Sequence, residues 1–344
     1  MMRSRAEVGI ALVGCGTIAR FAHLRTLRGL PGARVVAVVD PDARARNMAA
    51  RAASASPVST LEEALAHAGI DGVVVSSPTS LHAEHAVAAC RAGKHVYVEK
   101  PLAADLDGGR WVVAAAREAG VRVAVGYNRR LHPAARQARA ALSEGRIGGV
   151  LAVRSTFCEP QPKQGLPGWK RVRDTGGGVL LDLASHHVDL IRWLLGREIS
   201  TASAQLQDRS SELDTAWVHW TLDDGIAVQG FYSFGAGPLD QIELIGERGV
   251  LVIDRVRGVT TLVTRRSRRY GLGPQRSLSG PADLADRLRR LVQPAHDDSY
   301  RRALAAFVSI IAGRPTADAA ELATAEDGLR ALEAVLLAEA SCAS

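Results

Sequence analysis

The sequence contains few aromatic residues, few lysines and no long apolar run. Aromatic residues account for 4% of its 344 residues, so we expect a core built mainly from Val, Leu, Ile and Ala. No stretch approaches the roughly 18 continuous apolar residues of a membrane span, and we predict no membrane partner. Only four of the 43 basic residues are lysines, namely Lys94, Lys100, Lys163 and Lys170.

Cysteines are also few and scattered. Cys15, Cys90, Cys158 and Cys342 form no CxxC pair and no metal-like spacing. They argue against a disulfide framework and a zinc site, and they predict a protein of the reducing cytoplasm. The apolar run before Cys15, residues 8–13, is shorter than the roughly 7–15 residues of a signal-peptide core, which disfavours a lipoprotein signal.

The net charge of +7 is concentrated in one stretch. Residues 265–290 contain eight arginines and two aspartates, which together account for +6. A nucleic-acid-binding patch would interleave such cations with aromatic residues, and this stretch has only Tyr270. We therefore predict a solvated connection there and no nucleic-acid partner.

The first third of the chain alternates short apolar runs with amphipathic stretches. This rhythm is typical of parallel strands joined by crossover helices, and it predicts a doubly wound α/β domain over residues 1–127. The expected strands are residues 8–13, 35–39, 73–76, 95–98 and 121–126, and the expected helices are residues 18–30, 43–54, 60–68, 81–92 and 105–119.

Beyond residue 127, strands follow one another without helices between them. This pattern predicts a mainly antiparallel sheet in a second, α+β domain over residues 128–344. Its expected strands are residues 150–158, 199–208, 215–222, 226–234, 240–246, 249–254 and 258–264. Helices are expected at residues 133–143, from near the glycine triplet at 176–178 through Leu195, at 299–312 and at 319–340.

A glycine-rich turn connects the first strand to the first helix. Gly14 permits the tight turn, Gly16 lets the backbone approach a pyrophosphate, and the small Ala19 lets the helix pack against the strand. Asp40 ends the second strand, where its carboxylate can accept hydrogen bonds from an adenosine ribose. The pattern predicts a Rossmann dinucleotide-binding site formed by Gly14, Gly16, Thr17, Ile18 and Asp40. Because Asp40 would repel a 2′-phosphate, we expect the cofactor NAD, with NADP disfavoured.

Polar residues also follow the third and fourth strands. Ser77-Pro78 and Glu99-Lys100-Pro101 lie at strand carboxyl ends, where open α/β sheets bind ligands. A structural role poorly explains a lysine at the end of a buried strand. A catalytic role explains it better, because an ammonium beside a reacting alcohol stabilises the developing alkoxide. We predict that Lys100 is catalytic.

A further cluster follows the glycine triplet. Asp182 and His186 are four residues apart and share a helix face, and a carboxylate beside an imidazole suits proton transfer near neutral pH. No third ligand is placed with them, so we expect no metal site, and we expect His187 and Asp189 to be structural. In the preceding loop a sugar could stack on Trp169 and meet the cations Lys170 and Arg171. A loop anchored by one buried tryptophan fits the sequence equally well.

These motifs, in this order and spacing, closely resemble the glucose–fructose oxidoreductase / inositol dehydrogenase / rhizopine-catabolism (Gfo/Idh/MocA) oxidoreductases over nearly the whole chain. One departure is Ala184, where glycine is common. The resemblance implies a Rossmann domain, then a domain with a large open sheet that often builds dimers or tetramers, and a Lys-Asp-His site of Lys100, Asp182 and His186. Ser77, Pro78 and His82 match the family's cofactor-side loop, and Asn128 and Arg130 match positions near the nicotinamide and the substrate. We add Glu99 to the cofactor-binding candidates and Trp169 to the substrate-binding ones.

The predicted activity is that of a nicotinamide-dependent dehydrogenase or ketoreductase for a secondary alcohol of a sugar, sugar derivative or cyclitol. His186 would exchange the hydroxyl proton, Lys100 would polarise the same oxygen, and Asp182 would orient His186 or a second hydroxyl. Two alternatives remain open. One is an NAD-dependent glycoside hydrolase that works by transient oxidation and elimination, and the other is a binding protein that senses a dinucleotide without chemistry.

The second-domain strands carry bulky side chains on both faces. Trp217, His219 and Phe231 alternate with Val218, Trp220 and Tyr232. In a monomer the bulky side chains on the second face of the sheet would be exposed to water. We therefore predict a homodimer or homotetramer formed through this face.

Overall fold

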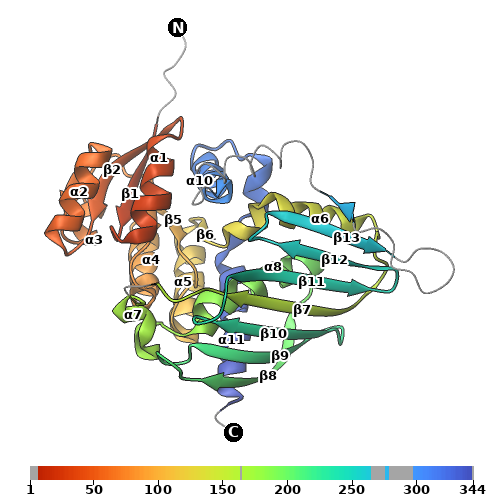
Figure 1. The fold of residues 1–344 in the computed structure, drawn as a ribbon. Helices are drawn as coiled ribbons and strands as arrows, with labels where there is room; N and C mark the ends of the chain where they lie inside the picture. The colour runs from red at the N-terminus through yellow and green to blue at the C-terminus, as the bar shows by residue number, and fades with distance from the viewer. Residues whose placement is uncertain (1–6, 163–164, 265–275, 279–296, 343–344) are drawn as a thin grey trace. The chain divides into compact units, whose positions relative to one another are not determined.

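The computed structural model describes residues 7–162, 165–264, 276–278 and 297–342 (Figure 1). The described residues up to Asn128 form one compact unit together with Asp298–Leu329, and Arg129–Asp297 forms a second with the residues from Arg330 onward. Apart from residues 276–278, the arginine-rich segment at 265–290 lies outside the described residues. No helix of this described part is long and apolar enough to cross a membrane.

The first unit is built on a seven-stranded sheet of order β15-β6-β5-β4-β1-β2-β3. Its strand pairs are parallel except for β15–β6, which confirms the predicted doubly wound Rossmann fold. The strands are β1 (Val8–Val13), β2 (Ala33–Val39), β3 (Ser56–Val58), β4 (Gly72–Val75), β5 (His95–Val98), β6 (Val123–Val125) and β15 (Ala323–Thr324). Every residue of β1 is buried, as expected for a central parallel strand.

Some helices of this unit begin at side-chain caps that the sequence offers. Thr60 accepts a hydrogen bond from the amide of Glu63, and Asp105 accepts one from the amide of Gly108. The helical segments are the π-helix η1 (Ala19–Leu24), α1 (Arg25–Arg28), α2 (Ala43–Ala53), α3 (Leu61–Leu65), η2 (Thr79–Leu81), α4 (His82–Arg91), α5 (Leu106–Ala119), α10 (Asp298–Ile311) and η6 (Ala317–Glu321).

The continuous helix predicted at 319–340 is wrong. Ala323 and Thr324 pair with β6 as strand β15, and α11 (Ala325–Ala340) starts only after them. Thr324 and Asp327 then cap α11 reciprocally, since each side chain accepts a hydrogen bond from the other residue's amide. Pairing with a strand distant in sequence has overridden the local helical periodicity.

The second unit carries an eight-stranded sheet of order β14-β13-β12-β11-β7-β10-β9-β8. Only β7 and β10 pair in parallel, so the mainly antiparallel sheet is confirmed for the described strands. These are β7 (Val150–Cys158), β8 (Ile199–Gln207), β9 (Thr215–Leu222), β10 (Ala227–Ser233), β11 (Leu239–Gly246), β12 (Gly249–Asp254), β13 (Val259–Thr264) and β14 (Arg276–Ser277). The helical segments are η3 (Asn128–Leu131), α6 (Pro133–Ser143), α7 (Gly168–Arg171), η4 (Arg173–Thr175), the π-helix η5 (Leu180–Ala184) and α8 (Ser185–Leu195).

The two faces of this sheet differ. Helices α6, α8 and α11 lie behind it (Figure 1), and Val218, Trp220 and Tyr232 are buried on that side. The indole of Trp220 donates a hydrogen bond of 3.1 Å to the carbonyl of Ala334 in α11. On the opposite face the alternate residues of β8, β9 and β10 are largely exposed, among them Trp217.

Candidate active site

The turn after β1 has the shape that a dinucleotide requires. Gly14 has a φ of +86°, and a Cβ there would lie 2.6 Å from the carbonyl oxygen of Ser76, so only glycine fits. A Cβ at Gly16 would meet no described atom within 4 Å, so the backbone of Gly16 borders open space. Thr17 is exposed and Ile18 is half-buried beside it. The turn therefore has room for phosphates at the backbone next to a helix start.

Asp40 is tied to this turn by its carboxylate. Its Oδ2 accepts a hydrogen bond of 2.7 Å from the amide of Cys15, and its Oδ1 accepts one of 2.8 Å from the amide of Asp42. Burial and the Asp40 carboxylate raise the pKa of the Cys15 thiol to about 12, so the thiol stays protonated at neutral pH. Asp40 thus supports the glycine turn from the end of β2.

His82 joins the two polar loops that follow β4 and β5. Its buried ring places Nδ1 2.7 Å from the carbonyl oxygen of Pro101 and Nε2 3.0 Å from that of Ser77. Burial lowers the pKa of His82, while the two carbonyls and Glu99 act in the opposite direction. The hydroxyl of Ser77 lies 2.9 Å from Nδ1 of His85. The predicted cofactor-side residue Ser77 is therefore linked through His82 to the segment that holds Lys100.

Glu99 anchors that segment from inside the unit. Its Oε1 lies 2.8 Å from Nε2 of the buried His23 on η1, and its Oε2 accepts a hydrogen bond from the Lys100 amide. Burial opposes ionisation of Glu99, but His23, Lys100 and His82 hold its pKa below the ordinary value. The Lys100 side chain itself is half-buried. The His23–Glu99 pair was not predicted, because nothing in the local pattern links these residues.

Asn128 is the last residue of the first of the two chain segments that form the first unit. Its amide Nδ2 donates a hydrogen bond of 2.8 Å to the hydroxyl of Ser299, and both residues are buried. The structure therefore places the predicted cofactor-binding residue Asn128 beside the start of α10.

In the second unit, each glycine of the triplet has its own structural reason. Gly176 and Gly178 have φ values of +86° and +99°, which disfavour other residues. A Cβ at Gly177 would lie 2.6 Å from the carbonyl oxygens of Lys170 and Val172. The loop that contains α7 and η4 therefore packs directly on the triplet. The helix predicted to start near the triplet begins with η5 at Leu180, and its first five residues are π-helical.

Asp182 forms an ion pair that the sequence analysis did not predict. Its Oδ2 lies 2.5 Å from Nζ of Lys170, and the side chains are 13% and 26% exposed, respectively. The same Nζ lies 5.5 Å from the centroid of the half-buried Trp169 ring. His186 follows four residues later on α8 and is half-buried, with its ring centroid 6.4 Å from that of Phe157. Within this unit, Trp169, Asp182 and His186 lie on α7, η5 and α8, respectively, and Lys170 links α7 to η5.

Arg130 lies in a buried ion pair. Its Nε and Nη2 donate hydrogen bonds of 2.9 and 2.5 Å to the two carboxylate oxygens of Asp189 on α8, and both side chains are almost fully buried. The structural role expected of Asp189 is confirmed. A contact of Arg130 with substrate stays a prediction.

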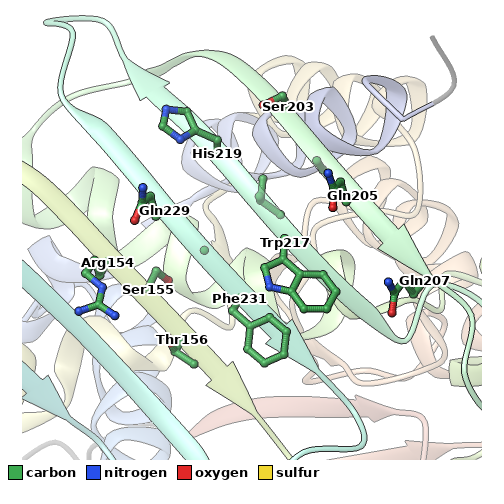
Figure 2. Close-up of a pocket in the computed structure, with 13 residues that line it drawn as sticks. Arg154, Ser155, Thr156, Ser203, Gln205, Gln207, Trp217, His219, Gln229 and Phe231 are labelled. Carbon is green, nitrogen blue, oxygen red and sulfur yellow. The ribbon is translucent and has the colours of Figure 1, made fainter.

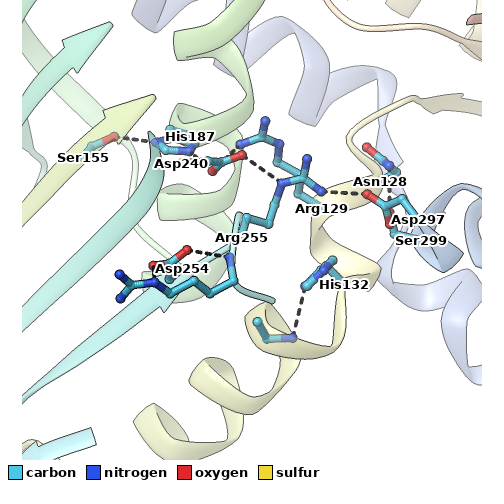
Figure 3. A network of polar contacts seen from close by, with 12 residues as sticks. Asn128, Arg129, His132, Ser155, His187, Asp240, Asp254, Arg255, Asp297 and Ser299 are labelled. Carbon is cyan, nitrogen blue, oxygen red and sulfur yellow. Dashed lines mark hydrogen bonds and ion pairs between the residues drawn. The ribbon is translucent and has the colours of Figure 1, made fainter. Parts of the chain in front are cut away.

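His187 belongs to a buried network centred on Asp240 (Figure 3). Its Nε2 lies 3.0 Å from Oδ1 of Asp240 and its Nδ1 lies 2.8 Å from the Ser155 hydroxyl. Arg129 and Arg255 donate to the same carboxylate. Burial would raise the pKa of Asp240, but Arg129, His187 and Arg255 hold it far below its usual range. The network makes His187 structural, as expected.

The described part of the chain contains no candidate metal site. No three or more of its His, Cys, Asp or Glu side chains are grouped so as to hold a metal ion.

Two family models cover most of the chain. The oxidoreductase family with an NAD-binding Rossmann fold matches residues 8–127, and the GFO/IDH/MocA C-terminal domain matches residues 135–252. The chain belongs to the Gfo/Idh/MocA oxidoreductase family. It is therefore an NAD-binding dehydrogenase or reductase, and this favours the oxidoreductase prediction over the glycosidase and sensor alternatives.

Named relatives of this Gfo/Idh/MocA protein are similar over most of their length. A 1,5-anhydro-D-fructose reductase of Ensifer adhaerens is 33% identical over 336 residues, 93% of this chain and 92% of the relative. An inositol 2-dehydrogenase of Saccharopolyspora erythraea is 34% identical over 312 residues, 88% of this chain and 84% of the relative. A levoglucosan dehydrogenase in complex with NADH shares the fold, with a TM-score of 0.84 at 20% identity over 98% of this chain and 97% of that one.

Proposed function

We propose that this protein transfers a hydride between NAD and a secondary alcohol or ketone of a sugar, sugar derivative or cyclitol. The observation that carries the proposal is the half-buried His186 at the start of α8, with the Asp182 carboxylate four residues before it. Such a pair suits proton exchange with a hydroxyl near neutral pH. The names of the inositol 2-dehydrogenase and the 1,5-anhydro-D-fructose reductase support this substrate class.

In the proposed mechanism, the hydride chemistry would come from NAD when it is bound. His186 takes the hydroxyl proton during oxidation and returns it during reduction. Lys100 donates a hydrogen bond to the same oxygen and stabilises its negative charge. Asp182 orients His186 or binds a second hydroxyl. Gly14, Gly16, Thr17 and Ile18 would receive the pyrophosphate, Asp40 the ribose, and Ser77, Pro78 and Asn128 the nicotinamide side.

Separate Lys100→Met and His186→Asn variants test these roles. A panel of sugars, cyclitols and keto sugars is first screened for absorbance change at the reduced-nicotinamide band. On the best substrate we expect Lys100→Met to lose on the order of 10²–10³ in turnover and His186→Asn about 10²–10⁴. Both variants should keep their affinity for NADH. Near-normal turnover in either variant contradicts its assigned role, and loss of NADH affinity points to a structural one.

The exposed face of the second sheet is the proposed site of self-association. Figure 2 shows Trp217 and Phe231 side by side in a groove that also contains His219, Gln205 and Gln229. The centroids of the two aromatic rings lie 4.9 Å apart, and Trp217 is 41% exposed. Burying this face against a second copy would remove the aromatic surface from water. We therefore infer a homodimer or homotetramer.

Light scattering on a size-exclusion column tests this assembly. Trp217→Glu should lower the measured mass to that of one chain, because a buried carboxylate without a partner opposes association. Trp111→Glu, at an exposed tryptophan on α5 of the first unit, is the matched control and should leave the mass unchanged. A wild-type monomer at micromolar concentration contradicts the proposal.

A cytoplasmic location is also part of the proposal. It is supported by the four cysteines, all of which are free and three of which are buried.

A further inference from the structure

His23 and Glu99 form a buried pair inside the first unit. Nε2 of His23 lies 2.8 Å from Oε1 of Glu99, and the two side chains are 0% and 10% exposed, respectively. His23 belongs to η1, and Glu99 directly follows β5. Neither side chain takes part in the proposed proton or hydride transfer, so the pair needs another explanation.

Stability alone explains this pair poorly. Taking a carboxylate out of water costs free energy, and a well-packed apolar pair of similar volume is often as stable as a buried ion pair or more stable. The surroundings of His23 would suit an apolar side chain, because the rings of Tyr97 and Tyr300 lie edge-on to it, with centroids 5.9 and 6.2 Å away. The polar pair therefore points to a role beyond packing.

The Glu99 carboxylate also holds the backbone of Lys100. Its Oε2 accepts a hydrogen bond of 3.2 Å from the Lys100 amide. Gly126 packs against the same oxygen, since a Cβ at that position would lie only 2.9 Å from it. With Oε1 beside His23, both carboxylate oxygens are fixed. The point from which the Lys100 side chain extends is thus anchored from inside the unit.

The helix that carries His23 begins at the proposed pyrophosphate site. Ala19 is the first residue of η1 and directly follows the glycine turn at residues 14–18. One carboxylate therefore links this helix to the backbone of Lys100. Such a link matters for the reaction, because a misplacement of about 1 Å in the reacting groups can cost on the order of 10²-fold in rate.

We propose that His23 and Glu99 are positioning residues that set the place of the Lys100 ammonium relative to the bound cofactor. His23 fixes the Glu99 carboxylate, and the carboxylate holds the Lys100 amide. The flexible four-carbon stem of a lysine makes the place of its ammonium depend on where the backbone is held. The inference rests on the proposed role of Lys100 in polarising the substrate oxygen.

The test measures kcat at saturating NAD for H23L and H23L/E99L, each with and without K100M, on the best substrate of the panel. H23L alone leaves the Glu99 carboxylate buried without its partner and is expected to be less stable. H23L/E99L replaces the pair with apolar side chains, so it should keep the wild-type midpoint of urea unfolding and decides the question if H23L does not fold.

Both H23L and H23L/E99L should lose about 10- to 100-fold in kcat. In the K100M background the same substitutions should lower kcat by less than about twofold, because no ammonium remains to be positioned and the effects are then not additive. H95L is the matched control, since His95 lies at the opposite end of β5 and its Nδ1 accepts a hydrogen bond from the amide of Arg122. It should keep the wild-type kcat.

The outcomes separate this inference from the proposed function. If H23L/E99L keeps the wild-type kcat, or loses as much in the K100M background as without it, the inference is wrong while the loss in K100M can still confirm the role of Lys100. If K100M itself turns over normally, that role fails and the inference fails with it. Affinity for NADH should equal that of wild type in H23L/E99L, and weaker binding at an unchanged kcat would overturn the inference by assigning the pair to cofactor binding.

Discussion

Oδ2 of Asp40 accepts a hydrogen bond from the amide of Cys15, 2.7 Å away in the glycine turn. The carboxylate proposed to bind the ribose therefore also holds the turn proposed to bind the pyrophosphate. Its second oxygen accepts a hydrogen bond from the amide of Asp42, the residue that caps α2. We therefore expect Asp40 to affect both the affinity for the cofactor and the choice between NAD and NADP.

Replacing Asp40 should change both properties. We expect Asp40→Ala to weaken NADH binding by about tenfold or more, because hydrogen bonds to a charged group are lost. NADPH binding should weaken less, since the charge that repels the 2′-phosphate is also removed, so the difference between the two cofactors narrows. Fluorescence titration with NADH and with NADPH measures this difference in affinity. Asp42→Asn, an exposed helix cap on the next turn, is the control, and equal affinities in wild type would refute the preference for NAD.

The buried pair of Arg130 and Asp189 makes a prediction about stability. Arg130→Met should lower the free energy of unfolding by about 3–5 kcal/mol, because it leaves the Asp189 carboxylate buried without its bidentate partner. Adding Asp189→Leu should recover much of that loss, since an apolar pair replaces the ion pair. Urea unfolding of the three proteins measures both effects. An Arg130→Met variant of wild-type stability that binds substrate weakly would instead assign Arg130 to the substrate.

Asp240 makes the stability depend on pH. Its native pKa lies far below the unfolded value of about 3.9, so its contribution is present above about pH 4 and is lost as the pH falls through the acid range. Asp240→Asn should be less stable than wild type at pH 7 and should lose less stability on acidification from pH 6 to pH 3. Urea unfolding across this range measures the difference. Asp174→Asn, at an exposed aspartate, should follow wild type, and parallel curves for Asp240→Asn and wild type would refute the prediction.

Trp220 is the largest fully buried side chain of the second unit's sheet. Trp220→Ala should cost about 3–5 kcal/mol through lost apolar burial and the cavity left behind, in addition to the hydrogen bond to Ala334. Trp220→Phe should cost less because most of the volume remains. Trp111→Ala, at a tryptophan that is 64% exposed, should stay within about 0.5 kcal/mol of wild type. Thermal or urea unfolding that ranks these variants otherwise would contradict the packing described.

Much of the fold could be predicted because its signals are local. The apolar run of β1, the glycine turn and the cap at Thr60 each depend on residues close in sequence. The cluster around Asp240 could not be predicted in this way, since Arg129 lies 111 positions from its partner. The same holds for β15, whose two residues are a strand only because β6 lies beside them.

The candidate site was predictable in its residue types and less so in its partners. The sequence pattern placed Asp182 and His186 on one helical face, but apolar periodicity does not distinguish a π-helix from an α-helix at η5. The partner of Asp182 comes from the loop before the glycine triplet, and its contact depends on how that loop packs on Gly177. The carbonyl contacts of His82 likewise require the loops after β4 and β5 to be positioned by the sheet.

The hydrogen bond between Asn128 and Ser299 has a practical meaning for protein engineering. It brings the end of one chain segment of the first unit to the beginning of the other, 171 positions later. For the cofactor-binding unit, residues 129–297 are thus an insertion between two adjoining points. A chain in which a short Gly-Ser linker joins Asn128 to Asp298 and which stops at Leu329 should fold and bind NADH alone. A chain cut at Asn128 should not, because it lacks α10, whose Phe307 ring packs 5.8 Å from that of Tyr97.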